Sequence, residues 1–236
     1  MALSLSQTKA LQGILKTGMR VASMGYPDII APIEEMPGLS YRADSAEICK
    51  RHGLPLRQIP DAESFFSLLG CKLHVYDIVQ ERGTEILCDL NKPLDPALRA
   101  WNYDIVLDVG TAEHCFNIGQ ALINMAGMVK MVGYIIHENP FNWGNHGFYN
   151  LNPTLFADFY TANGFELMDC RLVNRQGDGA KVPRTSRFRF PQEEVNVFAM
   201  ARRVEVKSFV FPVQSKYAGL IPAAVDRAEI KEVANG

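Results

Sequence analysis

The sequence predicts an α/β fold, in which a mostly parallel sheet is covered by helices on both faces. Short apolar runs, each ending near a polar or glycine-containing turn, lie at residues 19–25, 72–78, 84–90 and 103–110. Such near-continuous apolar strands are typical of a parallel sheet that is buried on both sides. A fifth run, at 131–140, follows a segment at 117–131 whose apolar side chains recur at helical spacing. This alternation of strands and helices predicts the fold.

The C-terminal third adds two further strands, at 165–173 and 194–204, on either side of a loop that begins at residue 174. The Gly, Asp and Pro content of residues 174–185 is typical of an irregular segment. We interpret residues 1–236 as a single domain. Within it, residues 26–72 form a long insert between the first and second strands, which we interpret as a lid or a substrate wall.

Composition excludes several classes of protein. Hydrophobic residues make up 47% of the 236 residues and charged residues 21%, as in a globular protein with a full core. The formal net charge of −2 does not favour nucleic acid as a partner, because such binding needs a cationic face. Five scattered cysteines indicate reduced thiols and a cytoplasmic location. No apolar run reaches the roughly 20 residues that cross a bilayer.

Polar or glycine residues follow each of the five expected parallel strands. They are Gly25, Asp77, Asp89 with Leu90, the segment 108–114, and His137 with the residues after it. In an open α/β sheet, ligands bind beyond the carboxyl ends of the strands, near the point where the strand order reverses. We therefore expect the functional site at this edge.

The first of these turns does not match a dinucleotide-binding fingerprint. That fingerprint needs three glycines, whereas this turn reads "GYPDII", in which Gly25 alone would let the backbone approach a ligand. A nicotinamide-dependent enzyme is disfavoured for this reason. Asp77 suits the two hydroxyls of a ribose, and Asp89 could accept a hydrogen bond from an adenine amino group; each acid taken alone is also a common solvated strand end.

Three segments in one order carry a more specific resemblance. They are "DLN" at 89–91 with Pro93, "GTAEHCFN" at 110–117, and "HGFYN" at 146–150 with Pro153, Leu155 and Phe156. The stretch from about 61 to 167 resembles class I S-adenosylmethionine-dependent methyltransferases, and more narrowly a bacterial subgroup marked by these segments. The resemblance implies a Rossmann-like, seven-stranded sheet with the last strand antiparallel, and S-adenosylmethionine as cofactor. It also implies cofactor-binding residues: Gly25, Asp77 at the ribose, Asp89 and Leu90 at the adenine, and Asp108, Gly110 and Thr111 beside the methionine moiety.

Catalytic candidates follow the fourth strand. Methyl transfer from a sulfonium is an in-line displacement, so an enzyme mainly positions the reactants and sometimes supplies a base. His114 is a candidate general base because an imidazole titrates near neutral pH. Glu113 could orient His114 or serve instead. A histidine that opens a helix and bonds a loop carbonyl is the structural alternative.

Residues after the fifth strand are candidates for binding the acceptor. His137, Asn139, Asn142, His146 and Tyr149 combine hydrogen-bond donors and acceptors with an aromatic ring, which suits a polyhydroxylated or amide-rich small molecule. A loop pinned by its own hydrogen bonds is the alternative interpretation. The histidines at 114, 137 and 146 with Glu113 or Glu138 could also form a two-histidine, one-carboxylate set. Their spacing fits no helical or finger motif, so the sequence favours no metal site.

The leading hypothesis is therefore a methyltransferase that acts on an oxygen or nitrogen of a small-molecule or carbohydrate acceptor in a biosynthetic pathway. A non-catalytic, methyltransferase-like binding or scaffold protein is the first alternative, because the first turn is poor in glycine. A nicotinamide-dependent oxidoreductase on the same kind of sheet is the second.

Overall fold

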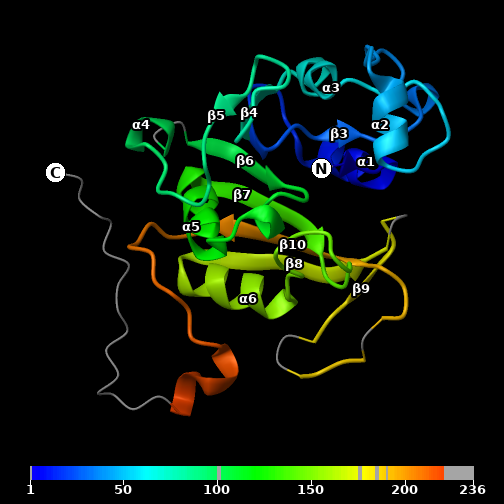
Figure 1. Cartoon of the computed structure of the whole chain (residues 1–236). Coiled ribbons are helices and arrows are strands. Elements are labelled where there is room, and N and C mark those ends of the chain that lie inside the picture. Colours follow the sequence, from blue (N-terminus) through cyan, green and yellow to red (C-terminus); the bar gives the residue numbers. More distant parts are fainter. Residues whose placement is uncertain (1, 100–101, 175–176, 184–185, 190, 221–236) are drawn as a thin grey trace.

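The computed structural model describes residues 2–99, 102–174, 177–183, 186–189 and 191–220 (Figure 1). Its main sheet has the spatial strand order β5-β4-β2-β6-β7-β10-β8-β9. In chain order the strands of this sheet are β2 (Arg20–Met24), β4 (Lys72–Asp77), β5 (Ile86–Leu87), β6 (Tyr103–Asp108), β7 (Val129–Pro140), β8 (Phe165–Val173), β9 (Gly179–Lys181) and β10 (Asn196–Arg203).

The topology confirms the expected Rossmann-like sheet. Strands β5, β4, β2, β6 and β7 pair in parallel, while β10 runs antiparallel to both β7 and β8. Leaving β9 aside, seven strands lie in the order third, second, first, fourth, fifth, seventh, sixth, and the last is the antiparallel one. The chain leaves β2 toward β4 on one side and later continues from β6 on the other. The switch point therefore lies between β2 and β6.

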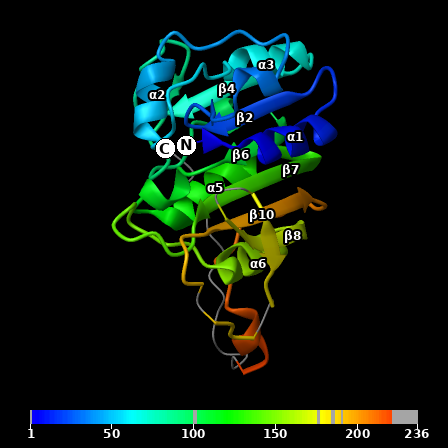
Figure 2. The same ribbon diagram turned by 90° about the vertical axis from the view of Figure 1, so that its right-hand side faces the viewer.

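The helices are α1 (Leu5–Ile14), α2 (Ser45–Arg51), α3 (Ala62–Leu68), α4 (Pro96–Arg99), α5 (Ile118–Met128) and α6 (Pro153–Ala162). Helices α1 and α3 pack on one face of the sheet and α5 and α6 on the other, while the buried residues of α2 form a separate small cluster. One-turn helices are η1 (Ile33–Glu35) and η2 (Ala112–His114), and η3 (Ser215–Leu220) is somewhat longer. A small second sheet pairs β1 (Ala2–Leu3) with β3 (Asp28–Ile29). Helices α2 and α3 lie at one end of the molecule, and α6 and β8 lie toward the other, with the orange-red η3 beyond them (Figures 1 and 2).

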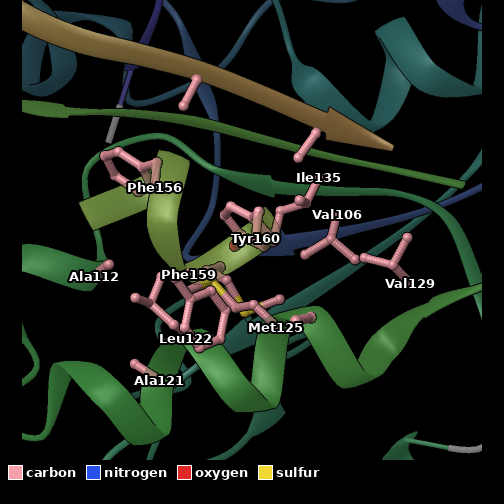
Figure 3. Packing of buried hydrophobic residues seen from close by; sticks show 14 of the residues in the cluster. Val106, Ala112, Ala121, Leu122, Met125, Val129, Ile135, Phe156, Phe159 and Tyr160 are labelled. Carbon is pink, nitrogen blue, oxygen red and sulfur yellow. The ribbon is translucent and has the colours of Figure 1, made fainter. Parts of the chain in front are cut away.

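Two apolar clusters show how the helices pack. On β6, Val106 joins the cluster formed with α5 and α6, whereas Ile105 and Leu107 join the cluster formed with α1 and α3. This alternation follows from the two-residue period of a strand. Figure 3 shows part of the first cluster, in which α5 and α6 supply most of the labelled side chains around the central strands.

Capping residues explain where α5 and α6 begin. The Asn117 side chain accepts a hydrogen bond from the Gln120 amide at the start of α5, and Asn152 does the same for Thr154 in α6, where Pro153 takes the first helical position. Helix α5 ends earlier than the expected segment 117–131, because the chain enters β7 directly at Val129.

The third strand is also shorter than expected. Only Ile86–Leu87 pairs with β4, because Asp89 starts a turn in which its carboxylate accepts from the Asn91 amide and its carbonyl accepts from Lys92. The loop after β8 contains β9, which was expected to be irregular and which pairs antiparallel with residues 171–173. Residues 175–176 and 184–185 of that loop lie outside the described residues. Within the described ranges, no helix combines the length and apolar character that a membrane crossing requires.

Candidate active site

A cavity of about 340 Å³ lies at the carboxyl ends of the parallel strands, at the switch point between β2 and β6. Its volume falls within the range of small-molecule sites. The cavity brings together predicted residues from four separate strand ends: Gly25, Asp77, Asp89, Leu90, Gly110, Thr111 and His114. The sequence-based expectation that these strand ends converge is thus met at one pocket.

Two glycines shape the turns at the pocket floor. Gly25 has φ +77° and Gly110 has φ +90°, a left-handed conformation that other residues adopt only with strain. The Gly25 amide donates to the carbonyl of Tyr76 at 2.7 Å, which ties the end of β2 to β4. The Thr111 hydroxyl donates to the Met24 carbonyl and ties the same turn to β6.

The acids at the ends of β4 and β5 both line the pocket, but Asp89 has more hydrogen-bond partners than Asp77. Asp77 accepts a hydrogen bond of 3.3 Å from the Val79 amide. Asp89 accepts from both the backbone and the side-chain amide of Asn91, and it pairs with Lys92 at 3.2 Å. The hydrogen bonds from Asn91, with Lys92, hold the pKa of Asp89 below its ordinary value, so this carboxylate is ionised at neutral pH.

The same cavity is lined by two arginines, Arg51 and Arg82, that the sequence analysis missed and that pair with carboxylates. Asp28 is buried and lies 3.4 Å from Arg82, 3.8 Å from Arg51 and 3.5 Å from His52. The guanidinium of Arg82 also stacks on the Tyr26 ring, 3.9 Å from its centroid. All of these residues except His52 line the cavity. The charges of the insert at 26–72 could have indicated these residues, because Asp28 and Arg51 lie within it. The sequence interpretation considered only the length of the insert.

The "DLN" turn is held by hydrogen bonds to α5 and to the residue that caps it. The Asn117 amide donates to the Asn91 side chain at 2.9 Å, which joins the "DLN" turn to the start of α5. Asn124, which is fully buried in α5, donates to the carbonyls of Leu90 and Lys92 and accepts from the Leu94 amide. Leu90 is thereby held at the pocket wall.

Behind the pocket, Asp108 is fully buried. It accepts hydrogen bonds from the amides of Thr111 and Ala112, and its other oxygen accepts from His137 at 2.7 Å. Burial opposes ionisation of Asp108, but the bond and charge of His137, together with the hydrogen bonds from Ala112 and Asn139, outweigh it and hold the pKa of the carboxyl below its ordinary value. The second ring nitrogen of His137 bonds the Tyr160 hydroxyl at 2.6 Å. Asp108 and His137 therefore fix the pocket turn from beneath rather than line the cavity.

Asn139 links this buried group to Glu113. Its amide nitrogen donates to Asp108 at 3.1 Å and to Oε2 of Glu113 at 2.9 Å, and both Asn139 and Glu113 are fully buried. Burial and the nearby charge of Asp108 raise the pKa of Glu113 to about 7. Oε1 of Glu113 accepts no hydrogen bond among the described residues. Asn139 is thus placed to position Glu113.

The loop after β7 docks directly on Glu113. The amides of Phe148 and Tyr149 both donate to the Glu113 carbonyl, at 2.9 and 3.3 Å. A Cβ on Gly147 would lie 2.9 Å from that carbonyl oxygen, so the contact requires glycine. As a result, His146 Nε2 lies 3.6 Å from Glu113 Oε1, and His114 Nε2 lies 3.8 Å from the same oxygen. The ligand atoms of the three side chains lie within 4.8 Å of one another.

The other predicted residues of this loop hold it together. Asn142 donates to the carbonyls of Pro191 and Glu193 and accepts from the Val195 amide, and the Tyr149 hydroxyl donates to the Phe116 carbonyl. The rings of His114 and His146 lie 5.2 Å apart, and burial together with His146 lowers the pKa of His114. These contacts set the rim of the pocket beside His114.

Comparisons with known proteins give the following. No family model and no curated protein matches this chain. Among solved structures, the chain is similar to the 1,6-didemethyltoxoflavin-N1-methyltransferase of Burkholderia thailandensis, whose structure holds S-adenosylhomocysteine (16% identity, 84% of this chain and 78% of that one, TM-score 0.46). It is also similar to a SAM-dependent methyltransferase from Archaeoglobus fulgidus (13%, 84% and 92%, TM-score 0.46) and to the cyclase SpnF (11%, 85% and 80%, TM-score 0.43). At such low TM-scores these similarities carry no weight for the activity, and the fold follows from the strand order itself.

Proposed function

We propose that this chain is a methyltransferase that uses S-adenosylmethionine and acts on an oxygen or nitrogen of a small-molecule or carbohydrate acceptor. One observation carries the proposal: a single cavity at the switch point is lined by Gly25, Asp77, Asp89, Leu90 and Thr111, from four different strand ends. When bound, S-adenosylmethionine supplies a methyl group on a positively charged sulfur.

The residues present fit each part of this cofactor. Asp77 would accept the two ribose hydroxyls, and Leu90 with the acid at 89 would hold the adenine. The glycine-poor first turn offers few exposed amides for the methionine carboxylate, and we propose that Arg51 and Arg82 bind it instead. A guanidinium presents donors in the fork geometry that a carboxylate matches. Asp28 would keep these two side chains in place.

For the acceptor side, we propose that His114 takes the proton of the reacting group and that Glu113 orients it. His114 lines the cavity, and about half of its side chain is exposed. We further propose that His146 and Tyr149 contact the acceptor, and that His137, Asn139 and Asn142 act by positioning them. Exposed Phe116 and Phe148, whose rings lie 5.5 Å apart, lie beside this rim and could stack on a sugar or aromatic ring.

The test is a thermal-shift comparison of S-adenosylhomocysteine with NAD. A ligand that binds the native state raises the melting temperature by mass action, so S-adenosylhomocysteine should raise it and NAD should not. A shift with NAD alone would favour the oxidoreductase, and no shift with either would favour the scaffold protein.

Variants sharpen the test. Asp77→Asn should weaken S-adenosylhomocysteine binding, whereas Asp178→Asn, an exposed acid outside the cavity lining, should not. His114→Gln should slow methyl transfer with donor affinity largely kept. Equal loss of donor affinity in the variants at 77 and 114 would remove His114 from the catalytic role.

A further inference from the structure

We infer that Glu113, His114 and His146 form a binding site for a divalent transition-metal cation of the Zn²⁺ or Co²⁺ type. Each residue offers one ligand atom, and the three atoms lie within 4.8 Å of one another. The sequence interpretation favoured no metal site, because the spacing of His114, His137 and His146 fits no known motif. In the structure His137 is committed to Asp108 and Tyr160, while the other two histidines converge on Glu113.

The distances fit ligands of one ion better than hydrogen bonds. Glu113 Oε1 lies 3.8 Å from His114 Nε2 and 3.6 Å from His146 Nε2. A separation of 3.6 Å is too long for a hydrogen bond. Nitrogen and oxygen ligands bind zinc at roughly 2.0–2.2 Å, which at a tetrahedral angle places neighbouring ligand atoms about 3.4 Å apart. The two imidazoles are about half-exposed, so their rings have room to turn toward a shared ion.

The state of Glu113 points independently to a ligand. Its side chain is fully buried, and Oε1 faces both imidazoles without a hydrogen bond from any described residue. A buried carboxylate oxygen without a partner is costly, and a cation there would satisfy it. Oε2 is already held by Asn139, which also bonds Asp108. Ligating carboxylates commonly have such outer hydrogen bonds, which fix their orientation.

The backbone brings the third ligand into place. The loop carrying His146 is fastened to the Glu113 carbonyl by two amide hydrogen bonds, and Gly147 allows this close approach. Two imidazoles and one carboxylate favour zinc, cobalt, manganese or iron over magnesium and calcium, which prefer oxygen ligands. Three protein ligands leave a coordination position open, as in catalytic rather than structural metal sites.

The candidate cation site adjoins the cavity, because His114 lines the cavity and is also one of the three ligands. A bound cation would therefore hold an acceptor through an oxygen atom and point it at the donor pocket, which favours a hydroxyl-bearing acceptor. This role rests on the proposed methyl transfer, whereas the cation site itself does not. With a cation bound, Nε2 of His114 is a ligand, so the proton transfer to His114 proposed above applies to the chain without the cation.

The test is a Co²⁺ titration of the full chain without a polyhistidine tag, followed by visible absorption and by competition with Zn²⁺. We expect one cation per chain. Glu113→Gln, His114→Gln and His146→Gln, which nearly keep side-chain volume, should each weaken binding at least about tenfold. His52→Gln is the matched control, since His52 also lies beside a buried carboxylate, 3.5 Å from Asp28, and this variant should bind cobalt as the native chain does.

Each outcome has a defined meaning. Absence of cobalt absorption in the native chain, or unchanged affinity in the variants at 113 and 146, overturns the inference; so does an equal loss in His52→Gln. The thermal shift with S-adenosylhomocysteine is measured on the same preparations and shows that each variant is folded. Cobalt binding without that shift would contradict the proposed function alone, and the shift without cobalt binding would contradict the cation site alone.

Discussion

Replacing Gly147 with alanine tests the contact that joins the loop after β7 to Glu113. The new Cβ would lie 2.9 Å from the Glu113 carbonyl oxygen and 3.0 Å from its Cγ. Ordinary contacts of this kind begin at 3.4 Å, so the loop or the η2 turn must move by about half an ångström. The carbonyl is fixed by the amide of Phe148, which leaves little room to move. Overpacking of this sort costs about 1–3 kcal/mol.

Gly144→Ala in the same loop is the control, because a Cβ there meets nothing within 4 Å. Neither glycine has a left-handed φ, so both substitutions are compatible with the backbone. Both variants lose the same freedom in the unfolded chain, which stabilises each by about 0.4–1 kcal/mol. The difference between them isolates the steric cost, and we expect Gly147→Ala to be the less stable by about 1–3 kcal/mol.

Urea denaturation with linear extrapolation measures that difference. The Co²⁺ affinity of the two variants is a second measurement, and Gly147→Ala should lower it because His146 moves with the loop. Equal free energies of unfolding and equal cobalt affinities in the two variants would refute the docking of this loop on Glu113.

Three further changes have expected outcomes. Asn124→Ala should destabilise the chain by at least about 2 kcal/mol, because it leaves buried carbonyls and an amide without their partner; thermal or chemical denaturation measures this, and a neutral result would contradict the account of the "DLN" turn. Val132→Asn should stabilise by about 1 kcal/mol, since this exposed β-branched residue has φ +57° and asparagine tolerates that conformation better; a loss of stability would speak against strain there. Arg82→Gln should raise the dissociation constant for S-adenosylhomocysteine roughly tenfold by calorimetry, while Arg202→Gln, on an exposed pair, leaves it unchanged; equal constants would remove Arg82 from the cofactor site.

The fold could be predicted from the sequence because its signals are local. The apolar runs at 72–78, 103–110 and 165–173 are strands within a residue or two, and polar residues at the ends of the first two line one cavity. The β9 strand was missed because three exposed residues in a loop of turn-forming composition carry no apolar alternation.

The site could be predicted only in part, because its remaining contacts join distant segments. His137 and His146 looked equivalent in the sequence, yet one is sealed beneath the pocket and the other meets Glu113 at the rim. His137 lies within β7 and is buried by its contacts with Asp108 and with Phe156 and Tyr160 of α6, whereas the position of His146 depends on how the loop after β7 folds back. The pairing of Arg51 and Arg82 on Asp28 likewise depends on the path of the insert.

The mutual hydrogen bonding of Asn91, Asn117 and Asn124 has a consequence for reading such segments in other chains. The side chains of these asparagines bond backbone groups of separate segments to one another, so selection for a stable fold would retain them even after chemistry had been lost. A protein could therefore carry the whole signature and catalyse nothing. Such a loss would be visible only in side chains that do not hold the fold together, above all the partly exposed imidazoles at 114 and 146.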